Sequence, residues 1–176
     1  MQVIAVVGSK KSGKTTTIEN LIKELTKRGY KVAAIKHVSE PDFTIDTQGK
    51  DTWKFARAGA KTILSVAANE VATIEKTALE NISLNALLKK CKGNDIILIE
   101  GLKKQVATKK NIPKIVVVKS KEEALNAQET YKPILAFSGP YSTGALSLKI
   151  PYADALKNPQ KLANIIEKTI LKKDNC

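Results

Sequence analysis

The sequence contains little arginine, histidine and cysteine. Of its 30 basic residues only Arg28 and Arg57 are arginines, and His37 is the one histidine. Because base readout and bidentate phosphate recognition favour arginine, the net charge of +13 predicts a lysine-rich solvated surface with local anion-binding lysines, and makes nucleic acid an unexpected partner. Cys91 and Cys176 have neither metal-site spacing nor the pattern of a disulfide framework.

Long apolar runs are missing as well. No segment reaches the roughly 18 apolar residues of a membrane span. The apolar start passes directly into a loop motif instead of a cleavage site, so no signal peptide is expected. With the scattered cysteines, this predicts a cytoplasmic protein without a membrane segment. The length of 176 residues fits one domain over residues 1–176.

The N-terminus carries the strongest motif of the chain. The apolar run Val3–Val7 leads into Gly8-Ser9-Lys10-Lys11-Ser12-Gly13-Lys14-Thr15, which matches the phosphate-binding pattern G-x-x-x-x-G-K-[ST]. In such a loop backbone N–H groups bind phosphate oxygens, the lysine reaches the β- and γ-phosphates, and the last hydroxyl ligates Mg²⁺. The predicted nucleotide-binding residues of this segment are Gly8, Lys11, Ser12, Gly13, Lys14, Thr15 and Thr16. Ser9, where partitioning ATPases have lysine, argues against that branch.

Apolar strands and amphipathic helices alternate along the chain. We expect strands at 3–7, 31–36, 62–67, 71–75, 96–99, 115–118 and 134–137, and helices at 15–28, 51–58 and 81–91, after Ser120 and after Asn158. Residues 103–111 are expected to be a basic, polar loop. The pattern predicts an α/β, three-layer P-loop NTPase fold with a mostly parallel sheet, helices on both faces and a candidate antiparallel hairpin at 62–75.

Three acids are candidates for the chemistry. Glu100 ends an apolar strand on the ligand edge of the sheet, so it is predicted to bind Mg²⁺ with Thr15. Asp46 and Asp51 lie in a polar loop that leaves the same edge. We assign Asp46 to the metal and Asp51, with Lys14, to catalysis, although Asp51 as a helix cap is an equally good interpretation. No N-K-x-D motif fixes the base.

Four stretches together resemble the molybdopterin-guanine dinucleotide biosynthesis protein B family. They are Ile35-Lys36-His37, Asp46 with Gly49-Lys50-Asp51-Thr52, Ala58-Gly59-Ala60, and Glu100-Gly101. The resemblance is strongest over residues 2–120. Two departures are the missing second histidine after His37, and Gln48 where the family often has proline.

The resemblance implies a homodimeric, GTP-binding accessory protein with slow, Mg²⁺-dependent GTP hydrolysis. Its partner would be the guanylyltransferase that joins GMP to molybdopterin. Because molybdopterin and its guanine dinucleotide are anionic, we expect Lys36, Lys50 and the basic segment Lys103, Lys104, Lys109 and Lys110 to hold them. The alternative is a small-molecule P-loop kinase that uses ATP, with Asp46 or Asp51 as base. Few arginines count against a kinase lid, and one histidine against a nickel metallochaperone.

Overall fold

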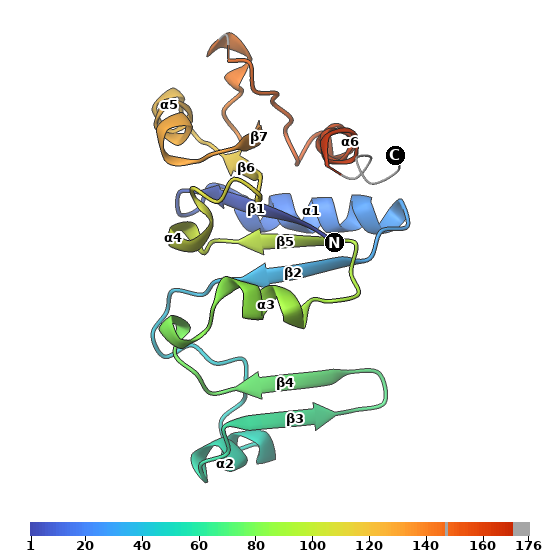
Figure 1. Cartoon of the computed structure of the whole chain (residues 1–176), viewed down its shortest axis with the longest axis vertical. Helices are drawn as coiled ribbons and strands as arrows, with labels where there is room; N and C mark the ends of the chain where they lie inside the picture. The colour runs from blue at the N-terminus through green and yellow to red at the C-terminus, as the bar shows by residue number, and fades with distance from the viewer. Residues whose placement is uncertain (147, 171–176) are drawn as a thin grey trace. The chain divides into compact units, whose positions relative to one another are not determined.

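The computed structural model describes residues 1–146 and 148–170 (Figure 1). Its internal contacts define two compact units: Met1–His37 together with the chain from Leu88 onward, and Val38–Leu87. Two compact units can belong to one domain, so the expectation of a single domain stays a prediction.

The first unit contains a five-stranded sheet and most of the helices. Its elements are β1 (Gln2–Gly8), α1 (Lys14–Lys27), β2 (Val32–Lys36), β5 (Ile96–Glu100), α4 (Lys103–Val106), β6 (Lys114–Val117), α5 (Lys121–Thr130), β7 (Ile134–Ser138), the 3₁₀ turn η2 (Thr143–Leu146) and α6 (Pro159–Thr169). The second unit contains α2 (Asp51–Arg57), β3 (Thr62–Val66), β4 (Val71–Glu75) and η1 (Leu79–Asn81). Helix α3 (Leu84–Lys90) runs through the boundary between the units.

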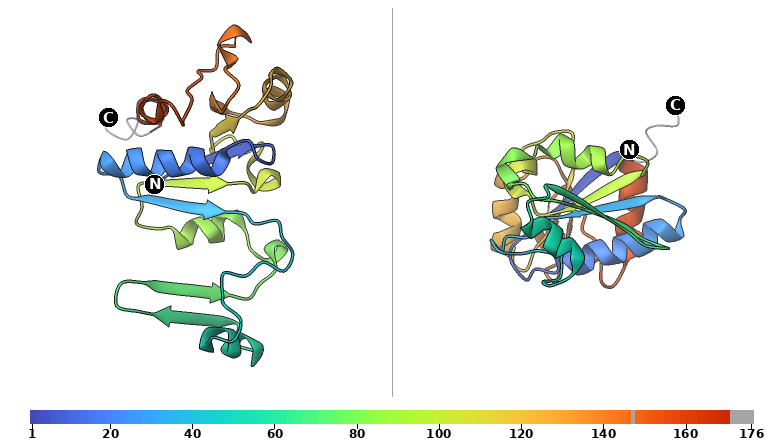
Figure 2. Two further views of the ribbon diagram at one scale, coloured as in Figure 1. Left: turned by 180° about the vertical axis from the view of Figure 1, so that it is seen from behind. Right: turned by 90° about the horizontal axis from the view of Figure 1, so that it is seen from below.

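The strands of the large sheet are all parallel, in the order β2-β5-β1-β6-β7. The connection from β1 to β2 runs in the opposite direction to those from β5 to β6 and from β6 to β7. Since such crossovers are right-handed, α1 must cover one face, and α4 and α5 the other. The views from opposite sides of the sheet agree with this (Figures 1 and 2). The predicted α/β fold with a mostly parallel sheet and helices on both faces is confirmed.

The core forms because the central strands are apolar along their whole length. Alternate strand residues on one face join the inner faces of α1 and α6 in a single buried cluster. Its fully buried members include Ile4, Val6, Leu21, Leu25, Ile96, Leu98, Ile115, Val117, Leu162 and Ile166. The alternating set of the other face is also fully buried and includes Ala5, Ile97, Ile99 and Phe137. A strand buried on both faces keeps its end in a fixed place, which positions the loops that follow it.

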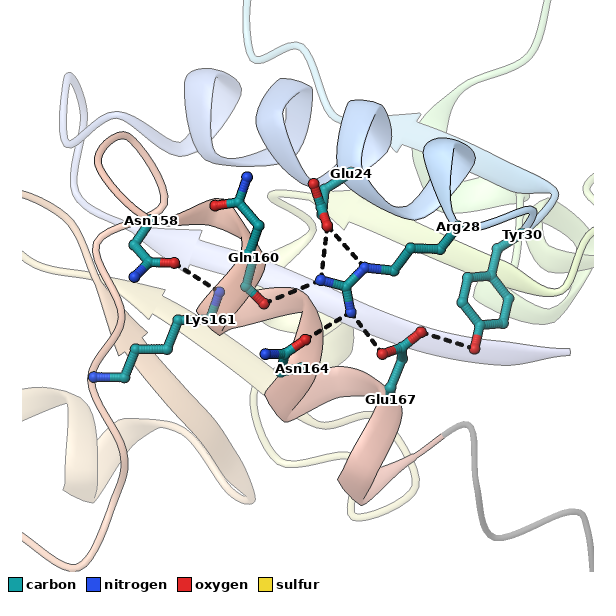
Figure 3. Close-up of polar contacts among 8 residues, drawn as sticks. All are labelled: Glu24, Arg28, Tyr30, Asn158, Gln160, Lys161, Asn164 and Glu167. Carbon is teal, nitrogen blue, oxygen red and sulfur yellow. Dashed lines mark hydrogen bonds and ion pairs between the residues drawn. The ribbon is translucent and has the colours of Figure 1, made fainter.

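Arg28 ties the end of α1 to α6 (Figure 3). Its guanidinium donates to the Glu24 carboxylate at 2.8 Å, to Asn164 Oδ1 at 2.8 Å and to the Glu167 carboxylate at 2.6 Å. The Tyr30 hydroxyl donates to the same Glu167 carboxylate at 3.1 Å. Helix α6 starts from the Asn158 side chain, which accepts from the Lys161 N–H, followed by Pro159, as the sequence predicts.

Lys114 is a charged residue inside the first unit. It opens β6, is fully buried, and its Nζ donates to the carbonyls of Lys109 at 2.7 Å and Lys132 at 2.6 Å. Burial lowers the pKa of Lys114 to about 8. No sequence pattern distinguishes Lys114 from the other lysines, of which the chain has 28 in all.

The second unit consists of an antiparallel pair, β3–β4, with α2 and a turn of 3₁₀ helix. This confirms the predicted hairpin. Of the strand residues only Ile63 is buried. Several large apolar side chains of the unit are exposed: Phe43, Ile45, Phe55, Leu64, Val66, Val71 and Leu79.

Two expectations for local structure were wrong. Residues 103–111 are not entirely loop, because α4 forms at Lys103–Val106, anchored by the fully buried Val106. One apolar anchor in a polar segment leaves no periodicity to detect. Asp51 does not cap α2 either: Lys50 is the N-cap residue, and Asp51 stands in the first turn with its carboxylate paired to Lys54.

No helix in residues 1–146 and 148–170 has the length and apolar character needed to cross a membrane.

Candidate functional site

The glycine-rich loop, residues 8–15, connects β1 to α1 at the carboxyl edge of the sheet. A Cβ at Gly8 would lie 2.3 Å from the Val117 carbonyl oxygen of the neighbouring β6, so only glycine lets the two strand ends approach this closely. Gly13 precedes α1 with φ of 96°, a left-handed conformation that glycine adopts without strain. The helix therefore begins at Lys14, and its first N–H groups lie at the end of the loop, where such groups bind anions.

Lys14 lies in a strongly cationic environment. Its Nζ donates to the Ser9 carbonyl of the same loop at 2.6 Å. Burial lowers the pKa of Lys14, and the charges of Lys103, Lys119 and Lys36 lower it further, while Glu100 opposes them. Four lysines from four different segments of the first unit thus lie near one another at the carboxyl edge of the sheet. Such a cluster favours an anion carrying several negative charges.

Thr15 and Glu100, which the sequence predicts at the same edge of the sheet, are in contact. The Thr15 hydroxyl lies 3.0 Å from one Glu100 carboxylate oxygen and 3.1 Å from the other. The contact forms because β5 is the direct neighbour of β1, which brings Glu100 level with Val6, two residues before the loop. A residue 85 positions away along the chain is placed here by sheet topology alone.

Lys36 pairs with Glu100 from the other side. In the register of β2 with β5 the two residues lie opposite each other, and Lys36 Nζ is 3.5 Å from a Glu100 carboxylate oxygen. The next residue, His37, donates its N–H to the Glu100 carbonyl at 2.9 Å. A Cβ at Gly101 would approach the His37 Cβ to 3.0 Å, and Gly101 has φ of 86°. A side chain at position 101 would therefore crowd His37.

Lys119 and Glu123 were missed by the sequence reasoning. Lys119 follows β6 and donates through Nζ to the Lys10 carbonyl of the glycine-rich loop at 3.3 Å. Glu123 accepts from the Lys119 N–H at 2.8 Å, and its own N–H donates to the capping hydroxyl of Ser120. Burial raises the pKa of Glu123, but hydrogen bonds from Lys119 and Ser9 and the charge of Lys119 outweigh burial and keep this pKa below its ordinary value. The predicted capping box located this helix start correctly; its position beside the loop depends on β6 being adjacent to β1.

The other predicted loop residues differ in their environments. Ser12 is buried, and its hydroxyl has no hydrogen-bond partner among the described residues. Lys11 is exposed with φ of 58°, and Thr16 is exposed on the first turn of α1. Lys103 is exposed at the start of α4, three residues after Glu100.

Asp46 and Asp51 belong to the second unit. One Asp46 carboxylate oxygen accepts from the Thr52 hydroxyl at 2.7 Å and from the Thr47 N–H at 3.0 Å, which fixes the turn before α2. The Asp51 carboxylate is exposed and lies 3.1 Å from Lys54 Nζ. These contacts are internal to the second unit, and the metal role of Asp46 and the catalytic role of Asp51 stay predictions.

The residues around Thr15 suit a magnesium ion. A hydroxyl and a carboxylate in mutual contact supply oxygen ligands, and Mg²⁺ in proteins takes one or two such groups together with waters and substrate phosphates. Among the described residues no group of three or more His, Cys, Asp or Glu side chains could hold a metal by itself.

The strand, glycine-rich loop and helix, beside a parallel strand that ends in an acid, define an α/β protein of the P-loop fold. Solved structures agree with this class. The crystal structure of Bacillus subtilis MobB matches with a TM-score of 0.74 at 23% identity, over 96% of this chain and 98% of that one. A crystal structure of molybdopterin-guanine biosynthesis protein B matches with a TM-score of 0.70 at 22% identity, over 94% and 97%.

The sequence then identifies the family. The model of the family described as molybdopterin guanine dinucleotide synthesis protein B matches residues 3–138, and the chain belongs to this family. The resemblance seen in the motifs is confirmed.

Two relatives have descriptive names. A Methanocaldococcus jannaschii protein, named a putative molybdopterin-guanine dinucleotide biosynthesis adapter protein, is 42% identical over 69% of this chain and 49% of its own length. A Haemophilus influenzae biosynthesis adapter protein of the same pathway is 33% identical over 75% of this chain and 67% of its own length. The alignment therefore spans about half of the first relative and two thirds of the second.

Proposed function

We propose that this chain is a GTP-binding adapter protein in the synthesis of molybdopterin guanine dinucleotide, with slow, Mg²⁺-dependent GTP hydrolysis. The contact between Thr15 and Glu100 beside Lys14 carries the proposal. It brings the three groups expected to bind phosphate and magnesium to one place on the first unit. Membership of the family supplies the pathway.

In the proposed complex, the backbone N–H groups of the glycine-rich loop and the Lys14 ammonium hold the phosphates, with Gly8, Lys11, Ser12, Gly13 and Thr16 as further loop contacts. Thr15 and Glu100 would hold magnesium, which would offset charge on the transferred phosphoryl group. The assignments of Asp51 to catalysis and of Asp46 to the metal rest on the sequence and stay predictions.

The contacts of the two arginines support slow hydrolysis. Arg28 is engaged by Glu24, Glu167, Asn164 and the Gln160 carbonyl, and the other arginine of the sequence, Arg57, belongs to α2 and lies over Trp53. An arginine that stabilises the transition state raises such rates by roughly 10³- to 10⁵-fold. Arg28, the arginine of the first unit, is engaged by these partners, so hydrolysis within this unit would depend on Lys14 and magnesium.

Molybdopterin or its guanine dinucleotide is the second proposed ligand. The supporting observation is the exposed pair Lys103 and Lys104 on α4, which starts on the loop's edge of the sheet, with Lys36 nearby on β2. Charge reversal of both α4 lysines should weaken binding of the pterin at least tenfold, because like charges then face its phosphate. Unchanged pterin affinity would remove these lysines from the proposal.

A homodimer and a complex with the guanylyltransferase complete the proposal. Support for self-association is the exposed apolar side of β3–β4, which carries Leu64, Val66 and Val71, since a two-stranded ribbon is marginally stable by itself. Sedimentation of the full chain, alone and with the transferase, tests both associations.

The central experiment compares wild type, Lys14→Ala and the control Lys23→Ala, an exposed change on the same helix. Calorimetric titration with Mg²⁺ should show GTP bound in preference to ATP, with affinity lowered roughly 10- to 100-fold in Lys14→Ala and unchanged in the control. Circular dichroism checks folding. Undiminished GTP affinity in folded Lys14→Ala would refute the phosphate site. Rapid ADP formation that needs a small acceptor would establish the kinase alternative instead.

A further inference from the structure

Glu100 already has a cation beside it. Its carboxylate accepts from the Thr15 hydroxyl and lies 3.5 Å from the ammonium of Lys36. Both contacts use the oxygens that the proposed function assigns to magnesium. The pairing is set by the sheet, since Lys36 and Glu100 are register partners at the ends of β2 and β5.

The side chains of Lys36 and Glu100 differ in how freely they can move away from each other. The Glu100 side chain is only 14% exposed, whereas that of Lys36 is 56% exposed. The lysine can therefore move its charge into water by rotating its stem, while the carboxylate stays fixed by Thr15 and the strand end. Lys14, which also senses Lys36 electrostatically, is tied to the loop through the Ser9 carbonyl.

We propose that Lys36 is an exchangeable counter-ion for Glu100, which competes with a divalent cation and is released when the cation binds. Without metal, the ammonium neutralises a largely buried carboxylate on the loop's edge of the sheet. A divalent cation at Thr15 and Glu100 would repel the ammonium, so both do not bind closely at once. The released Lys36 then adds its charge to the anion-binding lysines.

This inference rests on the proposed function, because it assumes that Thr15 and Glu100 hold the metal. It predicts in which direction the metal affinity changes when Lys36 is removed, and a role in orienting Glu100 would give the opposite direction. If Lys36 only oriented Glu100, its removal would weaken metal binding. If it competes, its removal strengthens metal binding in the absence of nucleotide.

The test titrates Mn²⁺ alone into nucleotide-free protein and follows the loss of the free-ion paramagnetic resonance signal. Lys36→Met keeps the apolar stem and removes the charge, and is expected to bind Mn²⁺ about three- to tenfold more tightly than wild type. Lys36→Arg keeps the charge and should bind Mn²⁺ like wild type. Lys23→Met, which removes a lysine from the exposed pair with Glu19 on α1, is the matched control and should also bind like wild type.

The double variant Lys36→Met with Glu100→Gln shows whether the gain belongs to this carboxylate, and it should lose the gain completely. Equal or weaker Mn²⁺ binding in Lys36→Met, or no binding in either protein, would overturn the inference. So would a gain that survives Glu100→Gln. GTP affinity of the wild type, measured separately, tests the proposed function: wild type that binds GTP while Lys36→Met shows no gain contradicts the counter-ion role alone.

Discussion

The two units differ in how far they bury their apolar residues. In the first, the central strands are buried on both faces, and the residues that follow them are held where the strands end. In the second, a two-stranded ribbon buries Ile63 and leaves Leu64, Val66 and Val71 largely exposed. A five-stranded sheet has enough neighbours to cover its residues and a two-stranded one does not. The first unit can therefore hold side chains in fixed positions, while the second exposes apolar surface.

Their carboxylates show the same contrast. The Glu100 side chain is 14% exposed and contacts Thr15 and Lys36, whereas that of Asp51 is 83% exposed and has a neighbour in its own helix as partner. A largely buried carboxylate is part of a fixed arrangement. An exposed one can reorient, so its role depends on what approaches it.

The largest expected effect on stability is at the strand end that shapes the loop. Gly8→Ala places a methyl group within 2.3 Å of a backbone oxygen and should lower the free energy of unfolding by about 3 kcal/mol. The added methyl group of Gly13→Ala has no atom within 4 Å. This variant should therefore lose only the cost of a positive φ, about 1 kcal/mol. Urea unfolding of both variants measures the difference. Equal losses would mean that the close approach to β6 does not constrain the loop.

Replacing the arginine of each unit by alanine compares the two units directly. Arg28→Ala leaves the part-buried carboxylates of Glu24 and Glu167 without their cation and should cost about 2 to 3 kcal/mol of unfolding free energy. Arg57→Ala removes a cation 5.8 Å from the Trp53 ring centroid and should cost about 0.5 kcal/mol. Thermal unfolding of the two variants decides the order, and a larger loss for Arg57→Ala would reverse the comparison.

Lys114 gives the first unit a pH dependence in the alkaline range. Its pKa is about 8 in the folded chain and 10.5 as the ordinary value, so below pH 8 both states are protonated and the cost of burying the ammonium is fully present. Between pH 8 and 10.5 the unfolded chain binds the additional proton, and stability rises with pH.

Between pH 7 and 9.5 this rise should amount to about 1 to 2 kcal/mol in wild type and be absent in Lys114→Met. Urea midpoints at the two pH values measure it, with Lys121→Met, on the exposed start of α5, as control. The same rise in wild type and Lys114→Met would show that the buried ammonium is not its source.

The smallest effect on folding is expected in the exposed row of the second unit. Leu64→Asn should change the free energy of unfolding by less than about 0.5 kcal/mol, because the side chain is 61% exposed. If the proposed homodimer uses this row, sedimentation will show weaker self-association in the same variant. A loss of several kcal/mol measured on the monomer would mean that this residue is structural.

Much of the fold followed from local patterns. Val3–Val7 and Ile96–Ile99 read as buried strands, the capping box at Ser120 and the Asn158-Pro159 pair marked helix starts, and each is present in the structure. Helix α4 was missed, because four residues with one buried valine carry no periodic signal. The helix predicted from residue 81 starts at Leu84, because Asn81 ends a 3₁₀ turn and the Ser83 hydroxyl accepts from the Ala86 N–H.

The candidate site also has one part that local sequence patterns predicted and one part that they did not. The glycine-rich loop with Lys14 and Thr15 is a contiguous motif, so the sequence by itself determined where phosphate is expected and to which family the chain belongs. Only the tertiary structure decided which distant residues join the loop. Strand order brings Glu100 to one side and Lys119 to the other, and register sets Lys36 opposite Glu100. The physical reason is that a motif within one turn fixes its own geometry, whereas contacts across a sheet depend on which strands become neighbours.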